Sequence, residues 1–139
     1  MTVLAVDPGS HKCGLAVVTG DGKCAQHKVI DREDLSGHVR QWMDRWSVDR
    51  LLVGGATGSK PVIDELRKQL QLEVIVVDEF RTTERARQRY FLDHPPRGLW
   101  RLVPLGLQVP PVAIDDYAAI VMAEDYLAQQ RNVRQEETA

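Results

Sequence analysis

An acidic residue at the end of an apolar run constrains the fold of this chain more than any other feature. The apolar residues 3–6 lead straight into Asp7, which a proline and a glycine follow. A second apolar run, residues 14–18, begins shortly afterwards. Such runs, separated by chain breakers, are typical of adjacent antiparallel strands. A carboxylate at the end of a central strand is costly to bury without a cationic partner. The sequence therefore predicts that Asp7 has such a partner.

Further along, strand-like and helix-like patterns alternate, which predicts an α/β domain. The expected strands are residues 3–7, 13–18, 23–30, 48–54 and 73–78, and the expected helices are 31–47, 61–70, 82–90 and 113–130. Short turns join the first three strands, and helices separate the later ones. This order predicts a mixed five-stranded sheet with three antiparallel N-terminal strands and helices on both faces.

Apolar spacing indicates which segments form the core. In the first helix, apolar residues recur every three or four positions and include Trp42 and Trp46, so we expect both tryptophans in the core. The β-branched run 74–77 is typical of a strand buried on both faces. Residues 117–123 are apolar all round, which predicts a well-buried final helix.

Size and composition favour a single soluble domain. With 139 residues, 43% of them hydrophobic, the chain can bury a core without metal or disulfide staples. We expect one domain over residues 1–130 and a polar, disordered tail over 131–139. No apolar run or basic leader indicates a membrane span or signal peptide. Cys13 and Cys24 are expected to be buried free thiols rather than a cross-hairpin pair, which favours the cytoplasm.

Acidic residues are expected to meet at one edge of the sheet. Asp7 ends the first strand, Glu79 follows the fifth, and Asp115 and Asp116 begin the last helix. Open α/β sheets carry their sites at the carboxyl ends of their strands. Clustered carboxylates repel unless cations separate them, and oxygen ligands suit Mg²⁺ or Mn²⁺. Two such ions about 4 Å apart hold a phosphodiester for hydrolysis.

Each acid also has a simpler explanation. Asp7 suits a turn before proline and glycine, and Glu79 can pair with Arg81 on the surface. Asp115 and Asp116 suit a helix start, where they meet the helix dipole. The coincidence of these acids on one predicted edge favours a metal site.

Basic residues near the acids indicate where a polyanion would bind. Between positions 81 and 101 lie six arginines and two acids, a local charge of +4. The loop 54–60 lacks the P-loop spacing, but its amides and its lysine suit a phosphate. Trp100 suits either base stacking or the core. The candidate nucleic-acid contacts are Lys12, Lys60, Arg81, Arg85, Arg89, Arg97 and Arg101.

Three segments resemble motifs of the YqgF/RuvX family, the RNase H-like nucleases related to Holliday junction resolvases. They are Leu-Ala-Val-Asp-Pro-Gly-Ser-His-Lys-Cys-Gly-Leu-Ala-Val (residues 4–17), Val-Asp-Glu-Phe-Arg-Thr-Thr-Glu (77–84) and Ile-Asp-Asp-Tyr-Ala-Ala (114–119). The resemblance implies an RNase H-like fold. It also implies that Asp7, Glu79 and Asp115 are catalytic metal-binding acids, with Asp116 as a neighbouring metal-binding acid. The chain departs from the family at Phe80, where arginine is usual, and in the loop 54–60, where Gly-Leu-Pro is usual.

The resemblance implies a nuclease that matures the 5′ end of pre-16S ribosomal RNA. The alternatives are a resolvase of Holliday junctions or other branched DNA, and a nucleic-acid-binding module without catalysis. An actin-like ATPase is disfavoured, because that fold needs two domains and this chain has one. Either a monomer or a homodimer is compatible with the sequence.

Overall fold

The computed structural model describes residues 1–9, 11–55, 59–70, 73–77, 82–94 and 115–138. Its strands are β1 (Val3–Asp7), β2 (Lys12–Val18), β3 (Cys24–Asp31), β4 (Arg50–Gly54) and β5 (Val74–Val77). Its helices are the 3-10 helix η1 (Arg32–Asp34), α1 (Leu35–Trp46), α2 (Lys60–Leu70), α3 (Thr82–Asp93) and α4 (Asp115–Thr138). The predicted order of elements is confirmed, with a 3-10 turn at the start of the first helix.

The strands form one mixed sheet in the order β3-β2-β1-β4-β5. β1 is central: it pairs antiparallel with β2 and parallel with β4. β2 also pairs antiparallel with β3, and β4 pairs parallel with β5. The predicted mixed sheet with three antiparallel N-terminal strands is confirmed.

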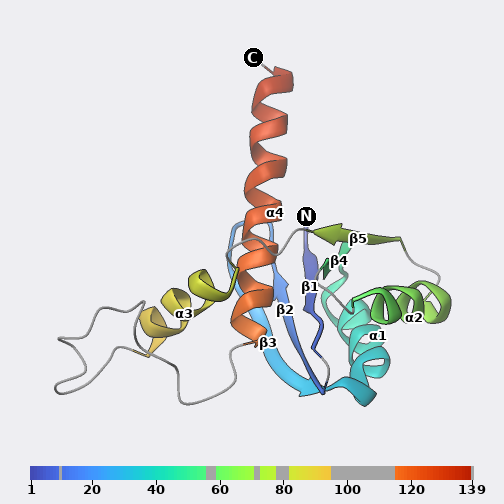
Figure 1. The fold of residues 1–139 in the computed structure, drawn as a ribbon. Helices are drawn as coiled ribbons and strands as arrows, with labels where there is room; N and C mark the ends of the chain where they lie inside the picture. The colour runs from blue at the N-terminus through green and yellow to red at the C-terminus, as the bar shows by residue number, and fades with distance from the viewer. Residues whose placement is uncertain (10, 56–58, 71–72, 78–81, 95–114, 139) are drawn as a thin grey trace, which may run out of the picture.

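Helices cover both faces of this sheet, with α1 and α2 on one side and α3 and α4 on the other (Figure 1). Successive side chains of β1 point to opposite faces of the sheet, so this strand contributes to both cores. Leu4 and Val6 join the core beneath α1 and α2, and Val3 and Ala5 join the core beneath α3 and α4. Trp42 is buried in the first of these cores and Trp46 packs against it while partly exposed.

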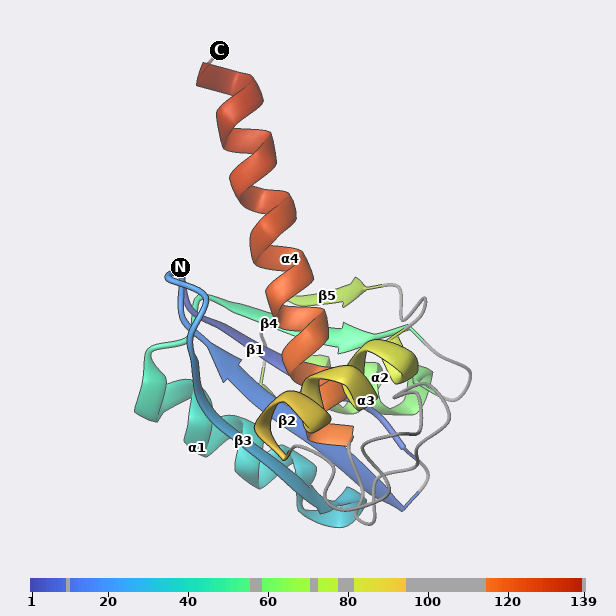
Figure 2. The ribbon, with the colours of Figure 1, turned by 90° about the vertical axis from the view of Figure 1, so that its left-hand side faces the viewer.

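The last helix is longer than the sequence predicts. It begins at Asp115 and continues to Thr138, beyond the boundary expected near residue 130. Residues 131–138 contain no glycine or proline to stop the helix, and arginine, glutamine and glutamate favour it. The C-terminal part of α4 extends past the sheet (Figures 1 and 2). Within the part of the chain that the structure describes, no helix has the length and apolar character to cross a membrane.

β5 differs from its expected environment. The sequence predicted burial on both faces, but β5 is an edge strand and Val76 is 49% exposed. The prediction is wrong because β-branched residues favour extended backbone at an edge as well as in the interior.

The two cysteines are free thiols on the two neighbouring strands β2 and β3, at opposite ends of their ladder. Cys13 is buried opposite Ile30, whereas Cys24 is partly buried opposite Val18. Burial raises the pKa of the Cys24 thiol to about 11, so it stays protonated at neutral pH. The prediction of free thiols rather than a cross-hairpin pair is confirmed.

The turn after β1 should tolerate no side chain at Gly9. A Cβ there would overlap the backbone carbonyl oxygen of Lys12, whereas a Cβ at Gly37 in α1 meets nothing within 4 Å. Gly9→Ala should lower the free energy of unfolding by more than about 1 kcal/mol, because backbone has to shift. Gly37→Ala should raise it by roughly 0.5–1 kcal/mol, because it removes a glycine from a helix interior. Urea denaturation of the two variants measures both; equal effects would contradict the tight turn.

Candidate active site

One edge of the sheet gathers the carboxyl ends of the parallel strands. Val6 pairs with Val53, so Asp7 lies level with Gly54, and Gly54 pairs with Val77 at the end of β5. The turn from β1 to β2 lies at the same edge, because Asp7 also pairs with Gly14. This edge, at the ends of β1, β4 and β5, is called the acidic edge below.

Of the predicted acids, Asp7 lies at the acidic edge, and two others occupy the first positions of α4. Asp7 ends β1 and is half-buried. Asp115 is the first residue of α4, where its backbone is described. Both ribbon views show α4 beginning at the side of the sheet where β1 ends (Figures 1 and 2). Glu79 lies outside the described residues, two positions after the end of β5.

Asp116 has protein partners on both carboxylate oxygens. Its Oδ2 lies 2.6 Å from Nδ1 of His27, and its Oδ1 accepts the backbone N–H of Tyr117 at 3.1 Å. Asp116 is only 7% exposed. A buried carboxylate needs such partners, and bonds to a charged acceptor are stronger than neutral ones. A carboxylate accepts hydrogen bonds, so Nδ1 of His27 is assigned as the donor.

His27 is a site residue that the sequence did not reveal. Its spacing matches no metal motif, and it lies on an edge strand 89 positions from Asp116. In the sheet it pairs with Ala16, which pairs with Ala5, two residues before Asp7. Strand spacing therefore puts the Cα of His27 about 12 Å from that of Asp7. Only the tertiary fold shows the contact with Asp116.

A second polar network joins α3 to α4. The hydroxyl of Tyr117 donates to Oδ2 of Asp93 at 3.2 Å, and Nη1 of Arg89 lies 3.4 Å from the other oxygen. Nε of Arg89 also lies 3.6 Å from Glu124. Arg89 was predicted to contact nucleic acid, and here its half-exposed guanidinium faces two acids. The Arg89–Glu124 ion pair and the Tyr117–Asp93 hydrogen bond join α3 to α4, whereas the Arg89–Asp93 pair lies within α3.

The other predicted cations differ in how far the structure describes them. Lys12 begins β2 and Lys60 begins α2, both exposed, and neither forms an ion pair with another described residue. Lys12 lies two residues before Gly14, which pairs with Asp7 at the acidic edge. Lys60 begins the helix that follows β4, the strand that ends at this edge. Arg85 lies on α3, where its backbone is described. The residues outside the described part are Arg81, Arg97, Arg101 and Trp100.

The chemistry of the acidic edge fits a hard divalent cation. Its predicted donors are carboxylates, the ligands that Mg²⁺ and Mn²⁺ prefer. Among the side chains that the structure describes, no three His, Cys, Asp or Glu residues group around a point where they would hold a metal ion. The predicted set needs Glu79 and the side chain of Asp115, which lie outside those described.

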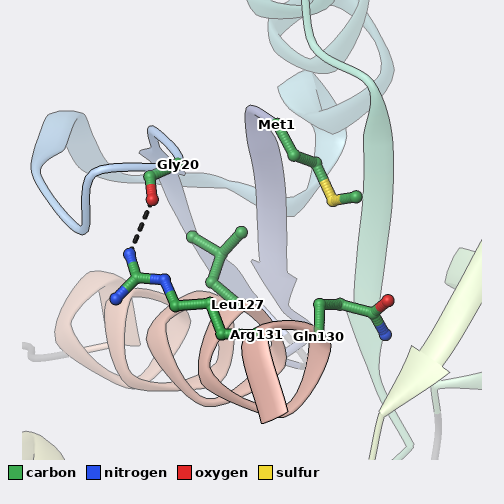
Figure 3. Close-up of a pocket in the computed structure, with 5 residues that line it drawn as sticks. All are labelled: Met1, Gly20, Leu127, Gln130 and Arg131. Carbon is green, nitrogen blue, oxygen red and sulfur yellow. Dashed lines mark hydrogen bonds between the residues drawn. The ribbon is translucent and has the colours of Figure 1, made fainter. Parts of the chain in front are cut away.

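A small hollow lies at the opposite end of β1 (Figure 3). It measures about 110 Å³ and is lined by Met1, Gly20, Leu127, Gln130 and Arg131. Nη2 of Arg131 donates to the carbonyl oxygen of Gly20 at 2.6 Å, which ties α4 to the turn after β2. The contact stabilises the packing of α4, and none of the predicted catalytic residues lines the hollow.

The fold is that of the resolvases. RuvC of Thermus thermophilus matches with a TM-score of 0.57 and 14% identity, over 95% of this chain and 97% of RuvC. The Fowlpox virus resolvase, in a structure with Holliday junction DNA, matches with a TM-score of 0.62 and 13% identity, over 94% of this chain and 99% of the resolvase. At these identities the likeness shows the fold, and it confirms the predicted RNase H-like class.

The chain belongs to the RuvX family. The family model, described as Holliday junction resolvase, matches residues 1–129. No curated protein sequence matches this chain. Family membership identifies the protein as a hydrolase of the nuclease class, as its motifs predicted.

Tyr117 should keep its proton to unusually high pH. Burial, followed by the hydrogen bond to Asp93, raises the pKa of its phenol from 10.0 to about 12. The raised pKa stabilises the fold below pH 10.0, and this contribution is lost as the pH rises towards about 12. Ultraviolet titration should show a tyrosine step near pH 12 that Tyr117→Phe removes and Tyr126→Phe retains. Persistence of that step in Tyr117→Phe would contradict the assignment.

Proposed function

We propose that this protein is a divalent-metal-dependent nuclease in which Asp7, Glu79 and Asp115 hold Mg²⁺ or Mn²⁺ at the acidic edge. The observation that carries the proposal is that Asp7 ends β1 at this edge and that α4, whose first residue is Asp115, begins at the side of the sheet where β1 ends. Membership of the RuvX family supports it independently. In the sequence Glu79 comes two positions after the end of β5, the strand whose last residue pairs with Gly54.

The residues at this edge have separate parts in hydrolysis. A pair of bound ions would activate a water molecule and stabilise the leaving oxygen. Asp7 supplies a donor fixed by the flanking strands, because β1 is paired on both sides. Lys12 and Lys60 contact backbone phosphates, which position the nucleic acid without reading its sequence. Asp116 is not a ligand in this proposal, because both of its oxygens are engaged by the protein.

The proposed substrate is the 5′ end of precursor 16S ribosomal RNA, in the cytoplasm. The support is the resemblance of the three acidic motifs to the YqgF/RuvX family. Free cysteines agree with a reducing compartment. A single-strand cut of this kind requires one active site, so a monomer suffices.

Branched DNA is the second candidate substrate. It is favoured by the family description, Holliday junction resolvase, and by the Holliday junction DNA in the structures of T. thermophilus RuvC and the Fowlpox virus resolvase. Resolution of a junction requires cuts in two strands, which a homodimer would supply.

Asp7→Asn should abolish cleavage while the fold and nucleic-acid binding remain. Loss of a metal ligand costs several kcal/mol of transition-state stabilisation, so cleavage should fall more than about 100-fold. The measurement is a panel of labelled precursor RNA and junction DNA with Mg²⁺ or Mn²⁺. Asp44→Asn, an exposed carboxylate on α1, is the matched control and should cleave normally. Normal cleavage by Asp7→Asn would contradict the proposed metal site.

Lys60→Ala should weaken nucleic-acid binding uniformly across sequences. Loss of one phosphate contact should reduce the slope of log affinity against log salt concentration by about 1. Lys68→Ala, at the other end of α2, is the control and should leave the slope unchanged. Fluorescence anisotropy over a salt series measures both; identical slopes for the two variants would remove Lys60 from the binding surface.

A further inference from the structure

The start of α4 is fastened to the far edge strand of the sheet. Asp116 makes this connection. Its Oδ2 contacts Nδ1 of His27 on β3, and its Oδ1 accepts the backbone N–H of Tyr117 in the first helical turn. The first N–H groups of a helix have no partners within the helix, so this carboxylate satisfies one of them. The same side chain thus contacts both the sheet and the helix start.

His27 is positioned by its strand and by a ring contact, and its side chain is 37% exposed. Its backbone pairs with Ala16 in the β2–β3 ladder. Its ring packs at a tilt against the ring of Tyr117, with centroids 5.2 Å apart. These contacts place Nδ1 of His27 2.6 Å from Oδ2 of Asp116.

The direction of Asp116 determines the rotation of the first turn of α4. Successive helical residues are separated by about 100° around the axis, because a turn contains 3.6 residues. Position 115 lies one turn before Ala119, on the same stripe of the helix. Ala119 is fully buried in the core that α4 shares with β1 and β2. Because Asp116 is bound to β3, the backbone at position 115, one residue earlier, is held with it.

We propose that His27 is a positioning residue for metal binding: it holds Asp116, and through the first turn of α4 it sets the placement of Asp115 relative to Asp7. This inference rests on the proposed function, because it assumes a metal site at the acidic edge. His27 contacts neither metal nor substrate; it acts through Asp116. Groups that orient the ligands of a metal typically change affinity or activity by about 10- to 100-fold when they are removed.

Two variants of His27 separate this role from simple stabilisation. His27→Ala removes the donor. His27→Asn restores it, because the side-chain amide nitrogen of asparagine occupies nearly the place of Nδ1. Gln26→Ala is the matched control: Gln26 is the neighbour on β3 and accepts a 3.1 Å bond from Nε1 of Trp46 on α1, on the other face of the sheet.

The first measurement needs no metal. Backbone amides of residues 119–121 bond to the carbonyls of the first turn of α4. Hydrogen exchange at these amides in the metal-free protein should accelerate in His27→Ala and return towards wild type in His27→Asn. Gln26→Ala should leave them unchanged.

The second measurement is Mn²⁺ titration by calorimetry, with cleavage at saturating Mn²⁺ followed in parallel. His27→Ala should weaken Mn²⁺ binding by about 10-fold or more and lower kcat, with KM for nucleic acid unchanged. His27→Asn should recover most of both losses, and Gln26→Ala should stay within about 2-fold of wild type.

The outcomes separate the two proposals. If wild type binds Mn²⁺ through Asp7 but His27→Ala binds it equally well, the positioning role of His27 is overturned and the proposed function stands. If His27→Asn is no better than His27→Ala, the hydrogen bond to Asp116 is not the cause and the inference fails. If wild type does not bind Mn²⁺, or Asp7→Asn binds it unchanged, both proposals fail.

Discussion

The parallel pairing of β1 with β4 is the constraint on which the rest of the structure depends. It sets Asp7 level with Gly54, and the pairing of β4 with β5 sets Gly54 level with Val77. Ligands of α/β sheets bind where parallel strands end, because loops and helix starts converge there. Had β4 paired antiparallel with β1, its end and the start of α2 would lie at the other edge, away from Asp7.

The packing of α4 on the sheet leaves this helix little freedom. Close approach of α4 to the sheet is possible because small residues line the contact, namely Ala118, Ala119 and Ala123. Their burial sets the distance between the helix and the sheet. The polar contacts of Asp116 and Asp93 then fix the rotation of its first turn, and Arg131 holds the helix where it leaves the sheet. Apolar packing supplies most of the stability, and these directional bonds make the orientation unique.

Local patterns predicted much of the fold and part of the site. Asp7 and the start of α4 were recognisable because strand ends, prolines and apolar periodicity are encoded by neighbouring residues. The partnership of His27 with Asp116 was not, since the register of β3 and the rotation of α4 together create it. The edge position of β5 and the continuation of α4 to Thr138 were missed because composition reports backbone preference rather than surroundings.

The proposed metal site requires Asp7 and Asp115 to bind divalent metal together at the acidic edge. The most direct test is a crystal of the protein soaked in Mn²⁺, with the anomalous difference map calculated at the manganese edge. We expect at least one peak within about 2–2.5 Å of carboxylate oxygens from both Asp7 and Asp115. Mn²⁺ peaks elsewhere on the protein, with none touching Asp7, would contradict it.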